Sequence, residues 1–359
     1  MGKKAIAPVI LYEGAHKEKD LTDLKKNYSI WKTVDIYESQ LKEYFEITHP
    51  DLIGQSTYQA QLTQFLKARQ MSASGGNWVY FPWNGHLIHC VNEKEYYLLR
   101  TNRNKNLITI DEQTKLNTSC IAFAGLSVGS GIATTLCYQG IGQTMKLAEF
   151  DTLETTNLNR MRGTLKDIGR SKLSIVSDQL YEINPYLHLI PYPDGLTKDT
   201  LNSFVHQKPK PAVIFEIIDD FEMKIRLRME ARIAKIPVIM MANLGDSILI
   251  DIERYDENSK LPMFNGVIGN LPEKILDNPN EDKHKYAVAI VGKENVPPRA
   301  IESVMQIGKT LVGRPQLGST VTTAAGIASY LTRMIILNQN LPSGRYRVVF
   351  SDLFDIKGL

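Results

Sequence analysis

The sequence has few cysteines and little excess charge. Its three cysteines, Cys90, Cys120 and Cys137, are too few and too scattered for a disulfide framework, and no Cys-x-x-Cys pair is present for a four-cysteine zinc site. The formal net charge of +3 gives no reason to expect a nucleic-acid partner, because nucleic-acid-binding domains concentrate basic residues. The remaining composition, 43% hydrophobic and 23% charged, is typical of a globular protein with a large core.

Long hydrophobic runs are also lacking. No apolar stretch approaches the roughly 18–20 residues that span a bilayer. The apolar stretch near the N-terminus contains Pro8 and continues into Glu13 and His16 without a small-residue cleavage site, which is not typical of a signal peptide. We therefore expect a soluble cytoplasmic protein with no membrane partner.

The chain divides into two regions. Residues 1–100 carry all three tryptophans, and we expect a small N-terminal α+β domain there. From Ser119 onward, strands alternate with helices, which is typical of a parallel sheet covered on both faces. We therefore expect residues 101–359 to form an α/β fold with a doubly wound, mostly parallel sheet. Residues 255–310 are rich in Pro, Asn and charged residues, and they are expected to form a variable crossover or cap.

The expected strands of this sheet are short apolar runs, and they cover residues 120–124, 144–149, 188–192, 212–218, 237–242 and 346–350. The expected helices cover residues 132–139, 171–183, 221–235 and 321–338. Asp219 is a candidate N-cap of the helix at 221–235, because aspartate side chains accept hydrogen bonds from the first helical N–H groups.

A small-residue loop, Gly125-Leu-Ser-Val-Gly-Ser-Gly131, links the first strand and helix of this region. Small side chains allow backbone N–H groups to approach phosphates at the positive end of a helix. About 24 residues later the next strand ends at Glu149, where an acidic side chain can bind ribose hydroxyls. Alone, these two features predict a nucleotide-binding sheet with NAD as the default ligand, and an NAD-dependent oxidoreductase is one alternative.

The segment after Glu149 favours a different ligand. Its sequence, Glu149-Phe-Asp-Thr-Leu-Glu-Thr-Thr-Asn-Leu-Asn-Arg160, resembles the Asp-x-Asp-x-Val-Glu-x-Ser-Asn-Leu-x-Arg motif of the ThiF/MoeB superfamily, which includes the ubiquitin-activating enzymes. Four further segments resemble motifs of the family in the same order, and they are Arg100-Thr-Asn-Arg-Asn104, Gly169-Arg-Ser-Lys172, Ile183-Asn-Pro185 and Ile218-Asp-Asp-Phe221. The resemblance covers roughly residues 100–250, and the whole chain also resembles a bacterial subgroup of this family.

The resemblance implies ATP- and Mg²⁺-dependent adenylation of a carboxylate with release of pyrophosphate. The implied substrate is the C-terminus of a ubiquitin-like carrier, a peptide or a small acid, and the implied assembly is a homodimer. The implied catalytic residues are Arg103, Arg160, Lys172 and Asp219. Asp219 is the implied magnesium ligand, and Arg103 reaches the phosphates within its own chain or from a partner subunit. The implied nucleotide-binding residues are Gly125, Ser127, Val128, Gly129, Ser130, Glu149, Asp151, Asn157, Arg160 and Lys172.

The chain departs from the family pattern at three points. Ser127 and Ser130 stand at the second and third glycine positions of the loop, where a serine hydroxyl can add a hydrogen-bond donor. Glu149 replaces the usual aspartate. No cysteine follows Cys137 and the zinc-binding cysteine pairs of many relatives are missing, so transfer of the acyl group to a thiol of this chain is not expected. The serines in the loop keep a second alternative open, a non-catalytic nucleotide-binding module.

Overall fold

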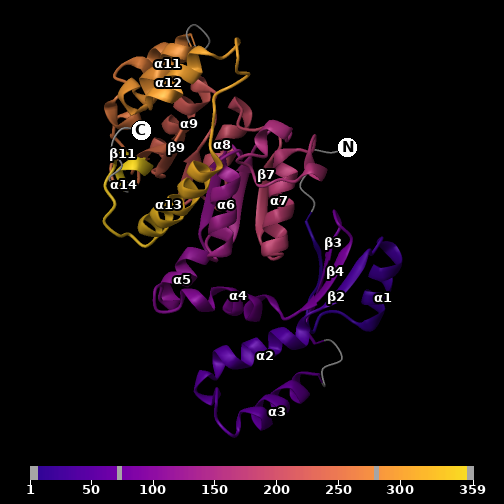
Figure 1. Ribbon diagram of the computed structural model, residues 1–359. Helices are drawn as coiled ribbons and strands as arrows, with labels where there is room; N and C mark the ends of the chain where they lie inside the picture. The colour runs from indigo at the N-terminus through magenta and orange to yellow at the C-terminus, as the bar shows by residue number, and fades with distance from the viewer. Residues whose placement is uncertain (1–6, 71–74, 279–282, 354–359) are drawn as a thin grey trace.

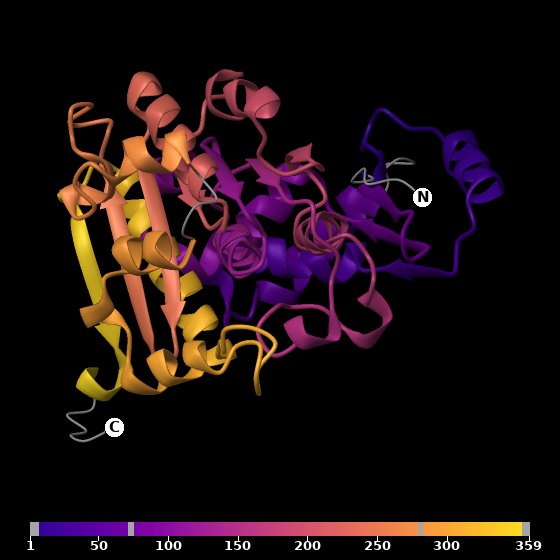
Figure 2. The same cartoon turned by 90° about the horizontal axis from the view of Figure 1, so that it is seen from above.

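Two β-sheets organise the chain in the computed structural model, which describes residues 7–70, 75–278 and 283–353. Residues 1–6, part of the N-terminal stretch considered above, lie outside the described residues. Figure 2 shows the C-terminal strands at one end of the molecule and the N-terminal segments at the other. None of the described helices combines the length and apolar content needed to cross a bilayer.

The smaller sheet is built from the N-terminal region. Its strands, in spatial order, are β1 (Val9–Leu11), β3 (Asn77–Phe81), β4 (His86–Cys90) and β2 (Lys32–Asp35). Its helices are α1 (Glu18–Asn27), α2 (Tyr37–Thr48) and α3 (Tyr58–Gln70). One face packs Tyr80 and Leu87 against Leu24 of α1, whereas Val79 and Phe81 join the core of the larger sheet. This arrangement confirms the expected small α+β unit.

The larger sheet has seven strands. In spatial order they are β11 (Gly344–Val349), β10 (Ser247–Glu253), β9 (Val238–Leu244), β8 (Val213–Glu216), β5 (Cys120–Ala124), β6 (Thr144–Ala148) and β7 (His188–Tyr192). The five strands from β9 to β7 are parallel, and β10 and β11 add antiparallel pairs at one edge. The expected mostly parallel sheet is therefore confirmed.

Helices cover both faces of this sheet, as Figure 1 shows. One face carries α6 (Gly129–Tyr138), α7 (Lys172–Ile183) and α13 (Gly318–Ile336), and the other carries α8 (Lys198–His206) and α9 (Phe221–Ala234). Near β9 and β10 the second face is also covered by α10 (Leu271–Asp277) and α11 (Lys283–Val291). The remaining helices are α4 (Glu93–Thr101) and α5 (Ile110–Asn117), which link the two sheets, α12 (Pro298–Met305) and α14 (Phe350–Leu353).

Two features of the large sheet differ from the sequence-based expectation. Helix α6 begins at Gly129, three residues before the expected start, so the last residues of the small-residue segment form its first turn. A Cβ atom on Gly129 would lie 3.6 Å from Ile217 Cδ1, and one on Gly131 would lie 3.6 Å from Ala325 Cβ. Strand β10 was not expected, because Asp251 interrupts its apolar run; in the structure this carboxylate is fully buried and paired with the Arg345 guanidinium.

Arg228 of α9 lies at the centre of a buried group of charges. Its Nη1 donates to Glu216 Oε2 and its Nε donates to Glu253 Oε2, both at 2.8 Å, and all three side chains are fully buried. The guanidinium also lies 3.7 Å from the centre of the Phe264 ring, and Lys224 Nζ adds a second bond to Glu216 at 2.6 Å. These bonds fix α9 against the end of β8, and so they position the loop that joins the two elements.

Candidate nucleotide site

Three loops lie side by side at the carboxyl edge of the large sheet, because β8, β5 and β6 are adjacent and parallel. Ligands of such sheets bind outside the carboxyl ends of the strands. The loops after β5 and β8 are in close contact at Gly125, whose φ is +95°. A Cβ atom at this position would lie 2.3 Å from the Ile217 carbonyl oxygen, so only glycine fits.

Glu149 fastens the glycine-containing loop to the end of β6. Its Oε2 accepts the Leu126 N–H at 2.9 Å, and its Oε1 accepts the N–H groups of Phe150 and Asp151 at 2.8 and 3.0 Å. The residue is 6% exposed. Glu149 therefore stabilises the backbone of the two loops. A ribose hydroxyl, the contact predicted from the sequence, would have to share its carboxylate oxygens with these three N–H groups.

The loop presents free backbone donors at the start of α6. Within the described residues, the N–H groups of Ser127, Val128 and Gly129 have no hydrogen-bond partner. They lie at the N-terminal, positive end of a 10-residue helix, which is an arrangement suited to phosphate. The Ser130 hydroxyl instead donates to the Ser127 carbonyl at 2.8 Å. It therefore stabilises the loop in this conformation, and the extra donor predicted at Ser130 is turned away.

Lys172, the first residue of α7, is joined to the segment that follows β6. Its Nζ lies 2.9 Å from Asp151 Oδ2, and its backbone N–H donates to the Asp151 carbonyl at 2.9 Å. The lysine side chain is 8% exposed, whereas that of Asp151 is 51% exposed. The structure thus brings two of the sequence motifs together, and Asp151 is the present partner of the ammonium group.

Arg160 has unused donor capacity. Its Nη1 donates to the Thr156 carbonyl at 3.1 Å and to Asn159 Oδ1 at 2.9 Å, but its Nε is buried without a partner among the described residues. Burial lowers the pKa of this guanidinium. An unpaired buried donor is costly, and an anionic ligand would remove that cost. Asn157 is also buried, and its Oδ1 accepts the Glu154 N–H at 3.1 Å, so it shapes the turn that carries Arg160.

Asp219 projects from the loop between β8 and α9, and its side chain is 93% exposed. Its partner is Arg314, whose Nη2 lies 3.0 Å from Asp219 Oδ1. The N-cap of α9 is Asp220, whose Oδ1 accepts the Met223 N–H at 2.8 Å. The N-cap predicted at Asp219 was therefore wrong by one residue, and the Asp219 carboxylate is not committed to the backbone.

A magnesium ion would fit this carboxylate. In the described residues no group of three or more acidic, histidine or cysteine side chains is arranged around a common point. Mg²⁺ does not need such a cage, because proteins often hold it through one or two carboxylates together with substrate phosphates. The Asp219 carboxylate is exposed and follows β8, the strand that pairs with β5 before the glycine loop, so its position is compatible with such a role.

The connection from α12 to α13, residues 306–317, also reaches this edge of the sheet, and we call it the strap (Figure 1). Asn159 Nδ2 donates to the Gln316 carbonyl at 2.7 Å. Immediately after the strap, a Cβ atom on Gly318 would lie 2.5 Å from the Asn159 carbonyl oxygen. Sequence analysis did not single out Arg314 of the strap; the available signal was a lone arginine between a glycine and a proline, beyond the expected crossover at 255–310.

Arg103 lies at the opposite end of α6 from the glycine loop. It is exposed, in the turn after α4, and its neighbours are bound to the C-terminal end of α6. Arg100 Nη1 donates to the Cys137 carbonyl at 2.8 Å, and Asn104 Nδ2 donates to the Gln139 carbonyl at 3.1 Å. A helix of this length extends about 15 Å. The structure therefore does not bring Arg103 together with the other predicted site residues of its own chain.

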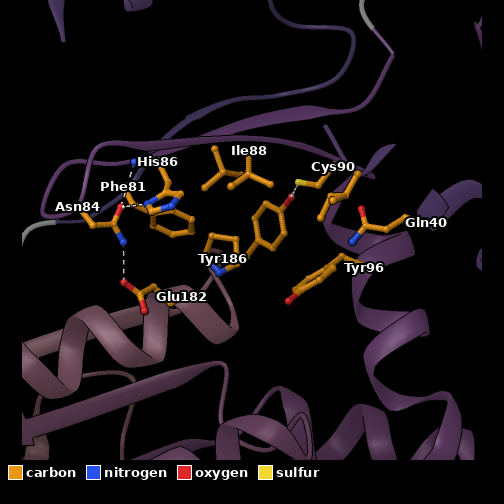
Figure 3. A pocket seen from close by; sticks show the side chains of 12 residues that line it. Gln40, Phe81, Asn84, His86, Ile88, Cys90, Tyr96, Glu182 and Tyr186 are labelled. Atoms are coloured by element: carbon orange, nitrogen blue, oxygen red, sulfur yellow. Dashed lines mark hydrogen bonds between the residues drawn. The ribbon is translucent and has the colours of Figure 1, made fainter. Parts of the chain in front are cut away.

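A separate cavity of about 380 Å³ lies between the small sheet and the C-terminal end of α7 (Figure 3). Its wall is mainly apolar and includes Phe81, Ile88 and Tyr186. At its edge the Asn84 side-chain amide donates to Glu182 Oε1 at 2.8 Å. Sequence analysis did not find this cavity, because its walls come from segments about 100 residues apart.

The fold defines a class of protein, the doubly wound α/β proteins, and a loop of small residues with free backbone N–H groups follows β5, the first strand of the large sheet along the chain. Residues 100–264 match the model of the ThiF family, and this part of the chain is a ThiF-family domain. The resemblance derived from the motifs is thereby confirmed.

Two curated relatives and one solved structure are similar to this chain. An uncharacterized protein of Mycobacterium tuberculosis is 32% identical over 279 residues, which are 77% of this chain and 38% of that protein. The tRNA threonylcarbamoyladenosine dehydratase of Escherichia coli is 28% identical over 130 residues, 36% of this chain and 47% of that enzyme. The chain thus spans less than half of either relative. The crystal structure of selenomethionine PaaA has the same fold, with a TM-score of 0.53 at 19% identity, over 85% of this chain and 92% of that one.

Proposed function

We propose that this protein adenylates a carboxylate with ATP and Mg²⁺ and releases pyrophosphate. One observation carries the proposal: residues from separate motifs of the ThiF-family domain meet at one edge of the sheet. Lys172 pairs with Asp151 after β6, and Asp219 projects from the neighbouring loop after β8. Between them lie the free N–H groups at the start of α6. This set offers backbone donors, cations and one carboxylate, which are the groups that phosphoryl chemistry on ATP requires.

In the proposed reaction a substrate carboxylate oxygen attacks the α-phosphorus of ATP. A new carboxyl–phosphate bond forms, the bond from the α-phosphorus to the bridging oxygen breaks, and that oxygen leaves with pyrophosphate. The N–H groups of Ser127, Val128 and Gly129 hold phosphate oxygens, and Lys172 and Arg160 balance their charge. A magnesium ion held by Asp219 would supply further neutralisation of the phosphates. No side chain of this protein has to become covalently modified in this step.

The distance of Arg103 from the proposed site of its own chain supports a homodimer. Since its own chain places it at the far end of α6, a second copy is the source we propose. Exposed apolar side chains lie on α4, on the segment that follows it, on α5 and at the end of α6, and they are Leu98, Leu107, Ile110 and Tyr138. Clusters of exposed apolar side chains are typical of surfaces that another protein covers. We therefore propose that this face is the dimer interface.

The cavity beside α7 favours a peptide or a protein C-terminus over a small acid as the substrate. Helix α7 has 12 residues, so Lys172 at one end and the cavity at the other are about 18 Å apart. An extended peptide spans that distance with about five or six residues. We propose that a residue upstream of the substrate carboxylate occupies the cavity. Replacing Ile88 by Trp should fill it and weaken peptide binding without changing the affinity for ATP.

The test of the proposed function is exchange of labelled pyrophosphate into ATP in the presence of candidate peptide acids. The wild-type protein should exchange, and Asp219→Asn should not. The matched control is Asp220→Asn, which removes the adjacent charge but keeps an N-capping side chain on α9. Equal exchange by the two variants would contradict the role of Asp219. ATP binding without exchange across a broad set of acids would support the non-catalytic alternative.

The oxidoreductase alternative has a direct comparison. Thermal unfolding should shift upward with ATP and Mg²⁺ and not with NAD, because a ligand that binds only the folded state stabilises it. The observation that disfavours NAD is the set of charged side chains beside the glycine loop, Lys172, Arg160 and Asp219, for which hydride transfer has no use.

A further inference from the structure

Arg314 is held near the proposed phosphate site by contacts that do not involve its own side chain. On its C-terminal side the strap is fixed by the bond from Asn159 Nδ2 to the Gln316 carbonyl, 2.7 Å long. Asn159 also accepts a bond from Arg160 Nη1 at 2.9 Å. One asparagine therefore connects the strap to the arginine of the main sequence motif. The place of Arg314 is consequently set by the backbone around it.

The close approach at Gly318 reinforces this position. A Cβ atom there would lie 2.5 Å from the Asn159 carbonyl oxygen, so the strap enters α13 in direct contact with the motif. A few residues later, the Thr320 hydroxyl donates to the Gly245 carbonyl at 2.6 Å, which ties the start of α13 to the end of β9. The end of the strap and the start of α13 thus contact the sheet edge on both sides of the loop that carries Asp219.

The bond between Arg314 and Asp219 is one that the protein can give up. The two side chains are 55% and 93% exposed, and exposed ion pairs contribute little to stability. A guanidinium forms stronger, often bidentate bonds with phosphate oxygens. If Asp219 turns to a magnesium–phosphate complex, Arg314 loses its partner beside the most negative part of the ligand. The exchange of partners costs little and replaces one bond to a carboxylate by bonds to phosphate.

We propose that Arg314 binds the β- and γ-phosphates of ATP, and that in the unliganded protein it pairs with Asp219 until ATP replaces this partner. This inference rests on the proposed function and adds a residue to it. It assigns to the strap a role in recognising the triphosphate, the part of the ligand that later leaves as pyrophosphate. A nucleoside monophosphate lacks those groups, so Arg314 distinguishes ATP from AMP.

The test compares the affinities of the full-length protein for ATP and AMP by titration calorimetry with Mg²⁺ present. Arg314→Ala should weaken ATP binding about tenfold or more and leave AMP binding unchanged, since charged hydrogen bonds are lost only with the triphosphate. Arg314→Lys should recover part of the ATP affinity, because the charge remains but the planar fork does not. The matched control is Lys309→Ala, which removes an exposed cation from the same strap and should bind both nucleotides like the wild type.

A second measurement tests the exchange of partners. Without magnesium, Asp219→Ala releases Arg314 and should bind ATP more tightly than the wild type. Adding Arg314→Ala to that variant should remove most of the gain. If the gain persists in the double variant, it reflects only the lost negative charge, and the proposed exchange of partners is wrong.

The outcomes separate this inference from the proposed function. A wild type that binds ATP and exchanges pyrophosphate, together with an Arg314→Ala variant of unchanged ATP affinity, would overturn the inference alone. Equal losses of ATP and AMP affinity would also overturn it, because they would indicate a general disturbance of the site. A wild type that does not bind ATP would overturn both.

Discussion

The guanidinium of Arg314 lies 3.0 Å from the carboxylate of Asp219, although the two residues are 95 positions apart in the chain. Both side chains are mainly exposed, so the bond joins the strap to the sheet edge at the surface. We expect Arg314→Ala and Asp219→Ala each to change the free energy of unfolding by no more than about 1 kcal/mol. Urea denaturation followed by circular dichroism measures this. A much larger change in either variant would mean that its functional loss has a structural origin.

Gly125→Ala should damage both stability and nucleotide binding. The added Cβ would meet the Ile217 carbonyl oxygen at 2.3 Å in a backbone conformation with φ at +95°. Strained backbone of this kind costs about 1–3 kcal/mol before the clash is counted. Gly131→Ala is the control, because its Cβ would lie 3.6 Å from Ala325 Cβ within a helix, where alanine is favoured over glycine. Thermal unfolding of the two variants should therefore move in opposite directions.

Glu149→Gln should loosen the glycine loop without changing the size of the side chain. The carboxylate accepts three backbone N–H groups, and the amide NH₂ of glutamine would face at least one of these donors. A buried donor left without a partner costs about 1–3 kcal/mol. Asp151→Asn, at a half-exposed position, should cost much less. Amide hydrogen exchange at Leu126 is the sharper measurement, and it should accelerate only in the Glu149 variant.

The three cysteines should be unreactive in the folded protein. Burial raises the pKa of the Cys137 thiol to about 12 and those of Cys90 and Cys120 to about 11. A thiol ionises as the pH rises through its pKa, so very little thiolate exists at pH 8 in the native state, and an ordinary value near 8.5 returns on unfolding. Labelling with an aromatic disulfide should give almost no modified thiol before denaturant is added and three afterwards. Rapid native labelling of Cys137 would contradict its burial.

The sequence predicted the structure well where an element or a motif is formed by residues close together in the chain. Strand β5 has the expected bounds, and Lys172 lies in the expected motif at the start of α7. It was less informative where a role depends on distant partners. The bond from the Leu126 N–H to Glu149 joins residues 23 positions apart, and the bond from Asn159 to the strap joins residues 157 positions apart, so no spacing rule predicts them.

The sequence also could not show which of two adjacent residues takes a given role, because this depends on the backbone geometry at each residue. Asp219 and Asp220 are equivalent as sequence letters, but the path of the chain from β8 directs only Asp220 toward the first turn of α9. Strand β10 escaped prediction for a different reason. Its carboxylates interrupt the apolar pattern, and their burial depends on partners that include Arg228 and Arg345 on other elements.

The placement of Arg103 has a consequence for stoichiometry. In the proposed homodimer each reaction centre takes Lys172 from one copy and Arg103 from the other, so neither copy would be competent alone. Mixing inactive Arg103→Ala and Lys172→Ala proteins in equal amounts should then restore activity to about a quarter of the wild-type level, because half of the randomly formed pairs contain one intact centre of two. Diluting the wild-type protein below the dissociation constant of the homodimer should abolish its activity as well. The specific activity of this protein would thus depend on its concentration, because only the assembled pair is active.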